Sequence, residues 1–167
     1  LALVVCADIA VYEDMSPRPT GGCGAIAMVV GPNAPIVFEK TVTSYFVNSF
    51  DFYKPNFSSP IPIVDGPLSL TQYYECMEEC FMEYRRREPI TLDSFNYVCL
   101  HTPFINHVKK CTGRLLYLTD KQDGDPEIAE SRANPKFVSE WSQKARDVFE
   151  AKVRPSLLLS EFCGNGY

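Results

Sequence analysis

The sequence predicts an α/β fold. Segments with strand-like apolar patterns alternate along the 167 residues with segments that have the amphipathic period of helices. Several of the strand-like segments are apolar at nearly every position, which is expected for strands whose two faces are both covered. Together these observations predict a sheet that lies, at least in part, between layers of helices.

The first 45 residues are predicted to form three strands. Residues 1–12 (LALVVCADIAVY) are almost continuously apolar, and residues 25–30 (AIAMVV) repeat this character after a turn rich in proline and glycine. Residues 36–45 follow a second turn at residues 31–33. They alternate well enough in polarity to predict a third strand.

A long loop and a helix are expected next. Residues 51–67 carry four prolines and little periodicity, and long structured loops of this kind are often functional. Ser69 and Gln72 have the spacing of a capping box, so we expect a helix that begins at Ser69. Its apolar residues recur at helical spacing up to Tyr84, and its basic end at residues 85–87 complements the helix dipole.

The remaining chain is predicted to continue this alternation. Residues 97–100 (YVCL) are expected to form a buried strand that ends at His101. Thr102 can cap a following helix, with Pro103 in its first turn. The further elements that we expect are a helix to about Leu116, a polar surface excursion over residues 119–135, a helix over residues 137–153, a strand over residues 156–160 and a turn over residues 163–167.

The composition argues against several classes of function. A net charge of −5, from 21 acidic and 16 basic residues, disfavours broad nucleic-acid binding, which needs a basic face. No apolar run approaches the ~20 residues of a membrane span. Seven cysteines in mostly apolar stretches favour buried thiols in a reducing compartment, and neither His101 nor His107 has the spacing of a zinc ligand. We therefore expect no metal, no nucleic acid and no membrane among its partners.

Three positions could carry chemistry. His101 lies where an apolar strand is expected to meet a helix N-terminus, a place where catalytic groups gather in α/β folds and where a neutral imidazole is favoured. The residues alone do not decide between a catalytic and a structural histidine there. Asn165 in a glycine-bracketed turn is, by itself, an ordinary turn residue. Lys109 and Lys110 can hold a phosphate or simply form a solvated helix face.

Several longer motifs occur in a fixed order, namely VVCADIAVY, RPTGG, GPNAPIVFE, DFYKP, PIVDG, LHTP and SLLLS. In this order they resemble the eukaryotic-type 3-hydroxy-3-methylglutaryl-CoA (HMG-CoA) synthases over nearly the whole chain. The resemblance implies an incomplete thiolase-like fold (layered αβαβα). Residues 1–88 would form the later part of its N-terminal half and residues 89–167 the beginning of its C-terminal half.

The resemblance also implies a reaction. Acetyl-CoA, acetoacetyl-CoA and water would give HMG-CoA and free CoA through an acetyl-cysteine intermediate. No cofactor would be needed beyond the coenzyme A thioesters, and the intact protein would be a cytoplasmic homodimer, an organellar form being left open. The family's cysteine nucleophile and glutamate base would precede Leu1, so we expect this chain to be inactive alone.

The family's residue roles are carried over only where its motifs match. His101 in LHTP would hold the acetoacetyl carbonyl, and Asn165 would be the second catalytic residue. The residues that would contact or adjoin the acyl-CoA are Thr20, Ser69, Lys110, Asp8 and Asp51. Asn106 stands where the family has a lysine, so one contact to a CoA phosphate is in doubt.

Two other classes of protein remain open on the sequence. One is another thiolase-fold condensing enzyme, such as a ketoacyl synthase, although DFYKP and PIVDG are not expected there. The other is a non-catalytic, truncated acyl-CoA-binding protein. The coding sequence upstream would separate them, because only a synthase needs the nucleophilic cysteine and a glutamate before it.

Overall fold

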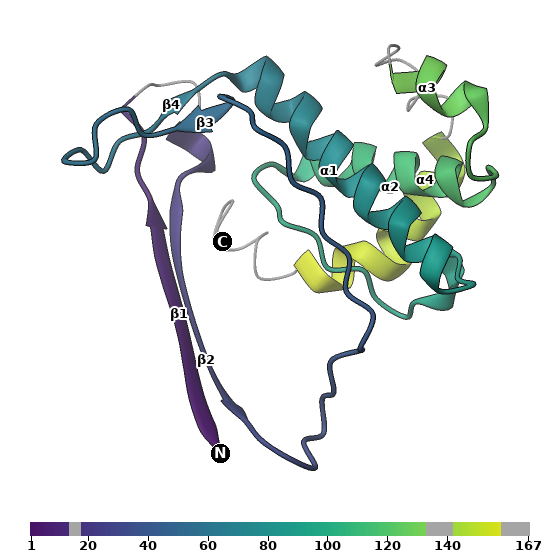
Figure 1. The fold of residues 1–167 in the computed structure, drawn as a ribbon, viewed down its shortest axis with the longest axis horizontal. Helices are drawn as coiled ribbons and strands as arrows, with labels where there is room; N and C mark the ends of the chain where they lie inside the picture. Colours follow the sequence, from purple (N-terminus) through teal and green to yellow (C-terminus); the bar gives the residue numbers. More distant parts are fainter. Residues whose placement is uncertain (14–17, 133–141, 158–167) are drawn as a thin grey trace.

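The computed structural model describes residues 1–13, 18–132 and 142–157. An antiparallel ribbon extends from one side, and a packed group of helices forms the other (Figure 1). The strands are β1 (Ala2–Ala10), β2 (Gly22–Val30), β3 (Phe52–Tyr53) and β4 (Ile63–Val64). The α-helices are α1 (Gly66–Arg87), α2 (Ile105–Thr119), α3 (Pro126–Arg132) and α4 (Ser142–Val148). The shorter helices are the 3₁₀ turns η1 (Arg18–Thr20), η2 (Leu92–Ser94) and η5 (Arg154–Leu157) and the π-helix η4 (Phe149–Val153).

The first two strands were predicted correctly, but their surroundings were not. β1 and β2 pair along their whole length, from Ala2 opposite Val30 to Ala10 opposite Gly22. The expected cover on both faces is absent among the described residues, and Val5 is 61% exposed. The reason is that no described helix packs on the ribbon (Figure 1). Its thiols share this exposure, and Cys99 before α2 is exposed as well, so the predicted burial of cysteines is wrong for Cys6, Cys23 and Cys99.

The third predicted strand, over residues 36–45, is not formed. The later part of this segment, residues 41–45, runs irregularly beside α1 (Figure 1). Alternate side chains there form hydrogen bonds with residues of α1 and with its C-cap, Glu88. The Thr43 hydroxyl donates to the Cys80 carbonyl at 2.9 Å, and the Tyr45 hydroxyl donates to Glu75 at 2.7 Å. The alternation in the sequence therefore marks alternate side chains whose hydroxyl groups face a helix, and the backbone does not pair with a strand.

α1 begins three residues earlier than predicted. Its N-cap is Asp65, whose Oδ1 accepts a hydrogen bond from the Leu68 amide at 3.1 Å. The proposed capping box that starts at Ser69 is wrong, because Asp65 already supplies the acceptor and Ser69 lies inside the first turns. The predicted basic end is confirmed at Arg87. The long loop before the helix contains the small β3–β4 pair, with Phe52 opposite Val64.

The elements after α1 differ more from the prediction. Residues 97–100 are irregular, because the Val98 amide binds the Lys152 carbonyl at 3.1 Å and not a neighbouring strand. Thr102 does not cap α2, since its hydroxyl donates to the Leu100 carbonyl at 2.9 Å. The helix instead begins at Ile105.

The polar excursion over residues 119–135 contains α3, and the helix expected over residues 137–153 is described from Ser142 as α4 and η4. Of the strand expected over residues 156–160, the described part lies in η5, and residues 158–160 lie outside the described ranges, as does the turn at residues 163–167.

The core lies around α2. The most deeply buried side chains of the described residues are Leu116, Leu118, Val108, Val153, Thr112 and Cys111. Beside this core is a buried ion pair, in which the Arg114 guanidinium contacts Glu78 at 2.7 Å and so joins α2 to α1. Ser131 and Arg132 of α3 complete its hydrogen bonds. None of the helices in the described ranges is long and apolar enough to cross a bilayer.

Candidate active site on helix α1

His101 lies in the irregular segment that leads into α2 and faces the second and third turns of α1. The Tyr73 hydroxyl donates a hydrogen bond to the His101 carbonyl at 2.9 Å, and the two rings are 6.5 Å apart. Part of the imidazole is exposed, but the atoms packed around it desolvate the ring and lower the pKa of His101 below its ordinary value of 6.5. At neutral pH the ring is therefore uncharged and can donate one hydrogen bond.

The N-terminal part of α1 connects His101 to two other predicted site residues. The Asp65 amide donates to the Asp51 carbonyl at 2.8 Å, and the Ser69 amide donates to the Asp65 carbonyl at 2.8 Å. Ser69 and Tyr73 are four residues apart, so they lie on the same face of the helix. Asp51 thus lies at the N-terminal end of α1, and Ser69 lies on the helix face whose next turn carries Tyr73, the partner of His101.

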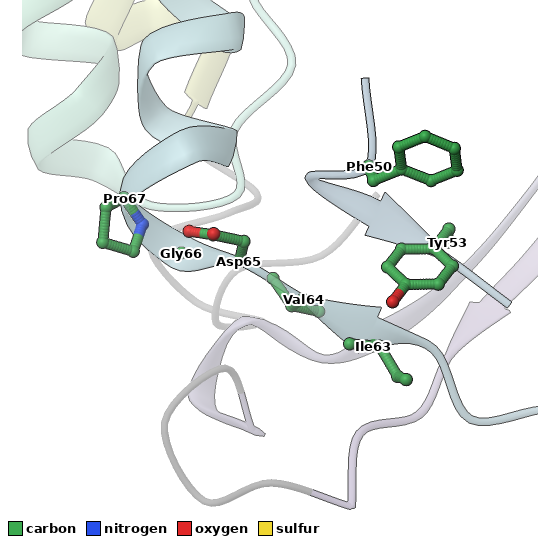
Figure 2. Close-up of a pocket in the computed structure, with 7 residues that line it drawn as sticks. All are labelled: Phe50, Tyr53, Ile63, Val64, Asp65, Gly66 and Pro67. Carbon is green, nitrogen blue, oxygen red and sulfur yellow. The ribbon is translucent and has the colours of Figure 1, made fainter. Parts of the chain in front are cut away.

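A pocket of about 460 Å³ opens at the start of α1. Figure 2 shows the Phe50 and Tyr53 rings on one side of it and Asp65 with Pro67 at the helix start on the other. The residues that line it are Phe50, Tyr53, Ile63, Val64, Asp65, Gly66 and Pro67. None of the described site residues predicted from the sequence is among them. The pocket adjoins Asp51 along the chain but does not include His101.

Asp8 and Thr20 lie on the ribbon side of the molecule. Asp8 is exposed on β1, where its Oδ1 accepts a hydrogen bond from the Ile9 amide at 2.8 Å. Thr20 ends η1, just before β2 begins. The end of the ribbon lies close to β3 and β4 (Figure 1). An edge-to-face contact joins Tyr12, just after β1, to Phe52 of β3, with ring centres 6.2 Å apart. The ribbon therefore brings Thr20 towards the β3–β4 pair.

Lys110 lies on α2, and its positive charge affects the pKa of a second histidine, His107. Burial and the nearby Lys110 ammonium lower the pKa of His107 below 6.5. The His107 ring contacts Phe104, with centres 5.2 Å apart, and its Nδ1 lies 3.2 Å from the Tyr74 hydroxyl. Asn165, the second predicted catalytic residue, lies outside the described residues.

The described thiols with shifted pKa values are poor nucleophiles. Burial raises the pKa of Cys111 to about 12. The pKa of Cys76 is also raised, chiefly by burial and further by the neighbouring Cys80, Glu75 and Asp51. Both therefore stay protonated at neutral pH, whereas a reactive thiol needs a lowered pKa. No group of three metal-ligating side chains occurs among the described residues.

Sequence reasoning missed the neighbours that hold His101. In the sequence, Tyr73 is one of the apolar residues that recur at helical spacing, and no pattern distinguishes Tyr74. His107 was considered only as a zinc ligand. A usable signal was present for the helix start, because Asp65-Gly66-Pro67 places an N-cap residue just before a proline in the first turn.

The chain matches two parts of one protein family. The family profile described as hydroxymethylglutaryl-coenzyme A synthase C terminal matches residues 36–167. The profile described as hydroxymethylglutaryl-coenzyme A synthase N terminal matches residues 1–35. These two profiles meet at residue 35. The separate division at residue 88, between thiolase-like halves, stays a prediction.

Curated relatives agree with these matches. The chain is 37% identical to hydroxymethylglutaryl-CoA synthase B of Dictyostelium discoideum, over 99% of this chain and 40% of that protein. It is 38% identical to the mitochondrial hydroxymethylglutaryl-CoA synthase of Rattus norvegicus, over 99% of this chain and 38% of that protein. The chain thus spans about two fifths of the length of these relatives.

Solved structures give the same result for the fold. MvaS in complex with 3-hydroxy-3-methylglutaryl coenzyme A superposes with a TM-score of 0.73 at 26% identity, covering 98% of this chain and 41% of that one. An HMG-CoA synthase complexed with CoA gives a TM-score of 0.68 at 27% identity, covering 98% and 37%. The likeness confirms the predicted α/β, thiolase-like fold class. The chain belongs to the hydroxymethylglutaryl-CoA synthase family.

Proposed function

We propose that this chain forms part of an enzyme that condenses acetyl-CoA with acetoacetyl-CoA. The acetyl group would pass from CoA to a cysteine supplied from outside this chain, which releases CoA. A base would then remove a methyl proton, and the resulting carbanion would attack the ketone carbon of acetoacetyl-CoA. Protonation of the alkoxide and hydrolysis of the cysteine thioester would release HMG-CoA. The observation that carries this proposal is the match of both family profiles over residues 1–35 and 36–167.

His101 is proposed to act in the carbon–carbon bond-forming step. Because burial lowers the pKa of His101, its imidazole is neutral at pH 7 and can donate a hydrogen bond to the ketone oxygen. That bond would strengthen as negative charge develops on the oxygen, which is how such donors lower an activation barrier. Asn165 is proposed as the second donor to the same oxygen.

The remaining site residues are proposed to hold the acyl-CoA. Ser69 and Asp51 adjoin the start of α1, and Thr20 and Asp8 would approach from the ribbon. Lys110 on α2 is an exposed cation that suits a phosphate of CoA. Asn106, one turn earlier, offers no positive charge, so we expect Lys110 to carry more of this interaction.

We also propose the setting in which the enzyme works. It would be a cytoplasmic homodimer, with residues 1–88 and 89–167 in its two thiolase-like halves, and would use no cofactor besides the CoA thioesters. Solved relatives were captured with HMG-CoA or CoA, which supports coenzyme A thioesters as the substrate class.

The proposal is tested on the full-length product of the coding sequence that contains this chain. The protein is given acetyl-CoA and acetoacetyl-CoA, and mass spectrometry follows HMG-CoA and free CoA. We expect the two products in equal amounts. Condensation only with a malonyl thioester on an acyl carrier protein would indicate a ketoacyl synthase. Binding of CoA without turnover would indicate a non-catalytic protein, and either result would overturn the proposal.

A further inference from the structure

Two adjacent tyrosines on α1 contact the two ends of the segment that carries His101. The Tyr73 hydroxyl donates to the His101 carbonyl at 2.9 Å. The Tyr74 hydroxyl lies 3.2 Å from Nδ1 of His107, in the first turn of α2. One helix thus holds both ends of a seven-residue segment through two phenol groups.

Ring contacts reinforce these two hydrogen bonds. Tyr73 and Tyr74 meet edge to face, with ring centres 5.7 Å apart. Tyr74 meets His107 in the same way at 6.2 Å, and Phe104 also contacts the His107 ring, with centres 5.2 Å apart. Because aromatic pairs prefer such angles, each ring limits the rotation of the next.

The second hydrogen bond joins two neutral groups and is coupled to the tautomer of His107. Burial raises the pKa of Tyr74 to about 12, so its hydroxyl keeps its proton at neutral pH. His107 is neutral, because burial and Lys110 lower its pKa. The phenol can donate to Nδ1 when the His107 proton is on Nε2, or its oxygen can accept from Nδ1–H in the other tautomer, so this hydrogen bond and the tautomer of His107 depend on each other. The lysine lies on α2 itself, and the face of α1 opposite His107 presents Tyr74.

We propose that Tyr73 and Tyr74 are positioning residues for His101, an inference that rests on the proposed role of His101 in condensation. Tyr73 fixes the backbone from which the imidazole projects. Tyr74 fixes the first turn of α2 through His107, which limits how far the segment can slide along α1. Both act through the segment and need no contact with substrate.

This role predicts a specific kinetic signature. Removing either hydroxyl should let the His101 ring leave its productive orientation, so the kcat of condensation should fall about tenfold, the equivalent of one hydrogen bond. Acetylation of the cysteine uses a different substrate and should keep its rate. The KM for acetyl-CoA should therefore change little.

The test compares Tyr73→Phe and Tyr74→Phe with a matched control. Tyr45→Phe also removes a hydroxyl that binds α1, through Glu75 at 2.7 Å, but touches neither histidine in the interactions described. The 167-residue chain has two histidines, so a histidine-labelled sample gives NMR signals from only two imidazole rings. Nitrogen chemical shifts report the tautomer of each ring, and kinetics are measured on the full-length product.

We expect Tyr74→Phe to mix the tautomers of His107 and both variants to shift or broaden the His101 signal, while Tyr45→Phe leaves both rings unchanged. Histidine signals that respond no more than in the control would overturn the proposal. So would an active full-length enzyme whose condensation kcat is insensitive to both changes. The NMR result does not depend on turnover. If the histidine signals change in the variants but the full-length product forms no HMG-CoA, the proposed function is refuted, whereas the contacts of Tyr73 and Tyr74 with the histidine segment are supported.

Discussion

The β1–β2 ribbon and the helical group around α2 contain similar apolar side chains but bury them to opposite extents. Ile26 of β2 is 58% exposed, whereas Leu116 of α2 is 1% exposed. The ribbon is held by backbone pairing along its length. The helical group adds a packed core and a buried ion pair between Arg114 and Glu78.

Some residues of the candidate site are held by the packed helical group, and others lie on the exposed ribbon. His101 depends on α1 and α2, which hold each other by their own packing. Asp8 and Thr20 depend on a ribbon with no described layer on its faces. We infer that the helical group determines the stability of this chain, and that side chains of the ribbon contribute little to it.

Breaking the buried ion pair should have the largest effect on stability. Arg114→Met leaves Glu78, which is 2% exposed, with the partly exposed Arg132 as its remaining cationic partner among the described residues. Removing one member of a buried pair typically costs about 3–5 kcal/mol in the free energy of unfolding. Denaturant titration measures this loss. The control is Glu150→Gln, which breaks the exposed ion pair between Glu150 and Arg154 and should cost about 0.5 kcal/mol or less.

Matched truncations test the two regions directly. Leu116→Ala removes buried methyl groups and should lower the free energy of unfolding by about 2–5 kcal/mol. Ile26→Ala removes a side chain of similar size from an exposed strand and should change it by about 0.5 kcal/mol or less. Thermal unfolding of both variants provides the comparison. Equal losses would show that the ribbon is covered in solution.

The two histidines predict a pH dependence that belongs to the helical group. Because burial lowers both pKa values below 6.5, the unfolded chain binds more protons as the pH falls. Stability should therefore be complete above pH 6.5 and decline below it, by at most roughly 1.4 kcal/mol per histidine for each pH unit. His107→Gln should flatten the decline measured between pH 7.5 and 5. An unchanged slope would contradict the desolvation of this ring.

The start of α1 gives a smaller, sharper test. Asp65→Ala removes the acceptor for the Leu68 amide and should cost about 1 kcal/mol. Ser69→Ala should cost much less, because Ser69 is not the N-cap. Chemical denaturation measures the loss of stability in each variant. A larger loss for Ser69→Ala than for Asp65→Ala would support the capping box inferred from the sequence.

The sequence predicted elements well where local pattern and environment agree. The apolar runs of β1 and β2 pair as strands, and the period of α1 gives its face and its basic end. The strand predicted over residues 97–100 is not formed, because a short apolar run does not specify its hydrogen-bond partner. Here the Val98 amide donates to the carbonyl of Lys152. The exposure of the ribbon could not be predicted, since an apolar pattern does not show whether another element packs on the strand.

The candidate site shows the same limit. His101 was found from its place between an apolar run and a helix start, and from its motif. Tyr73 and Tyr74 were not, because they lie 28 residues or more before their partners in the sequence. Only the packing of α1 against the segment before α2 brings them together.

The central claim is that His101 serves the condensation step, and splitting the two half-reactions tests it most directly. In the full-length product, His101→Ala should slow condensation roughly 10²- to 10³-fold, the usual cost of losing one donor to a developing oxyanion. Radiolabelled acetyl-CoA should still acetylate the cysteine at the wild-type rate. Condensation at the wild-type rate, or loss of both half-reactions together with unfolding, would show that His101 is structural and would contradict the account.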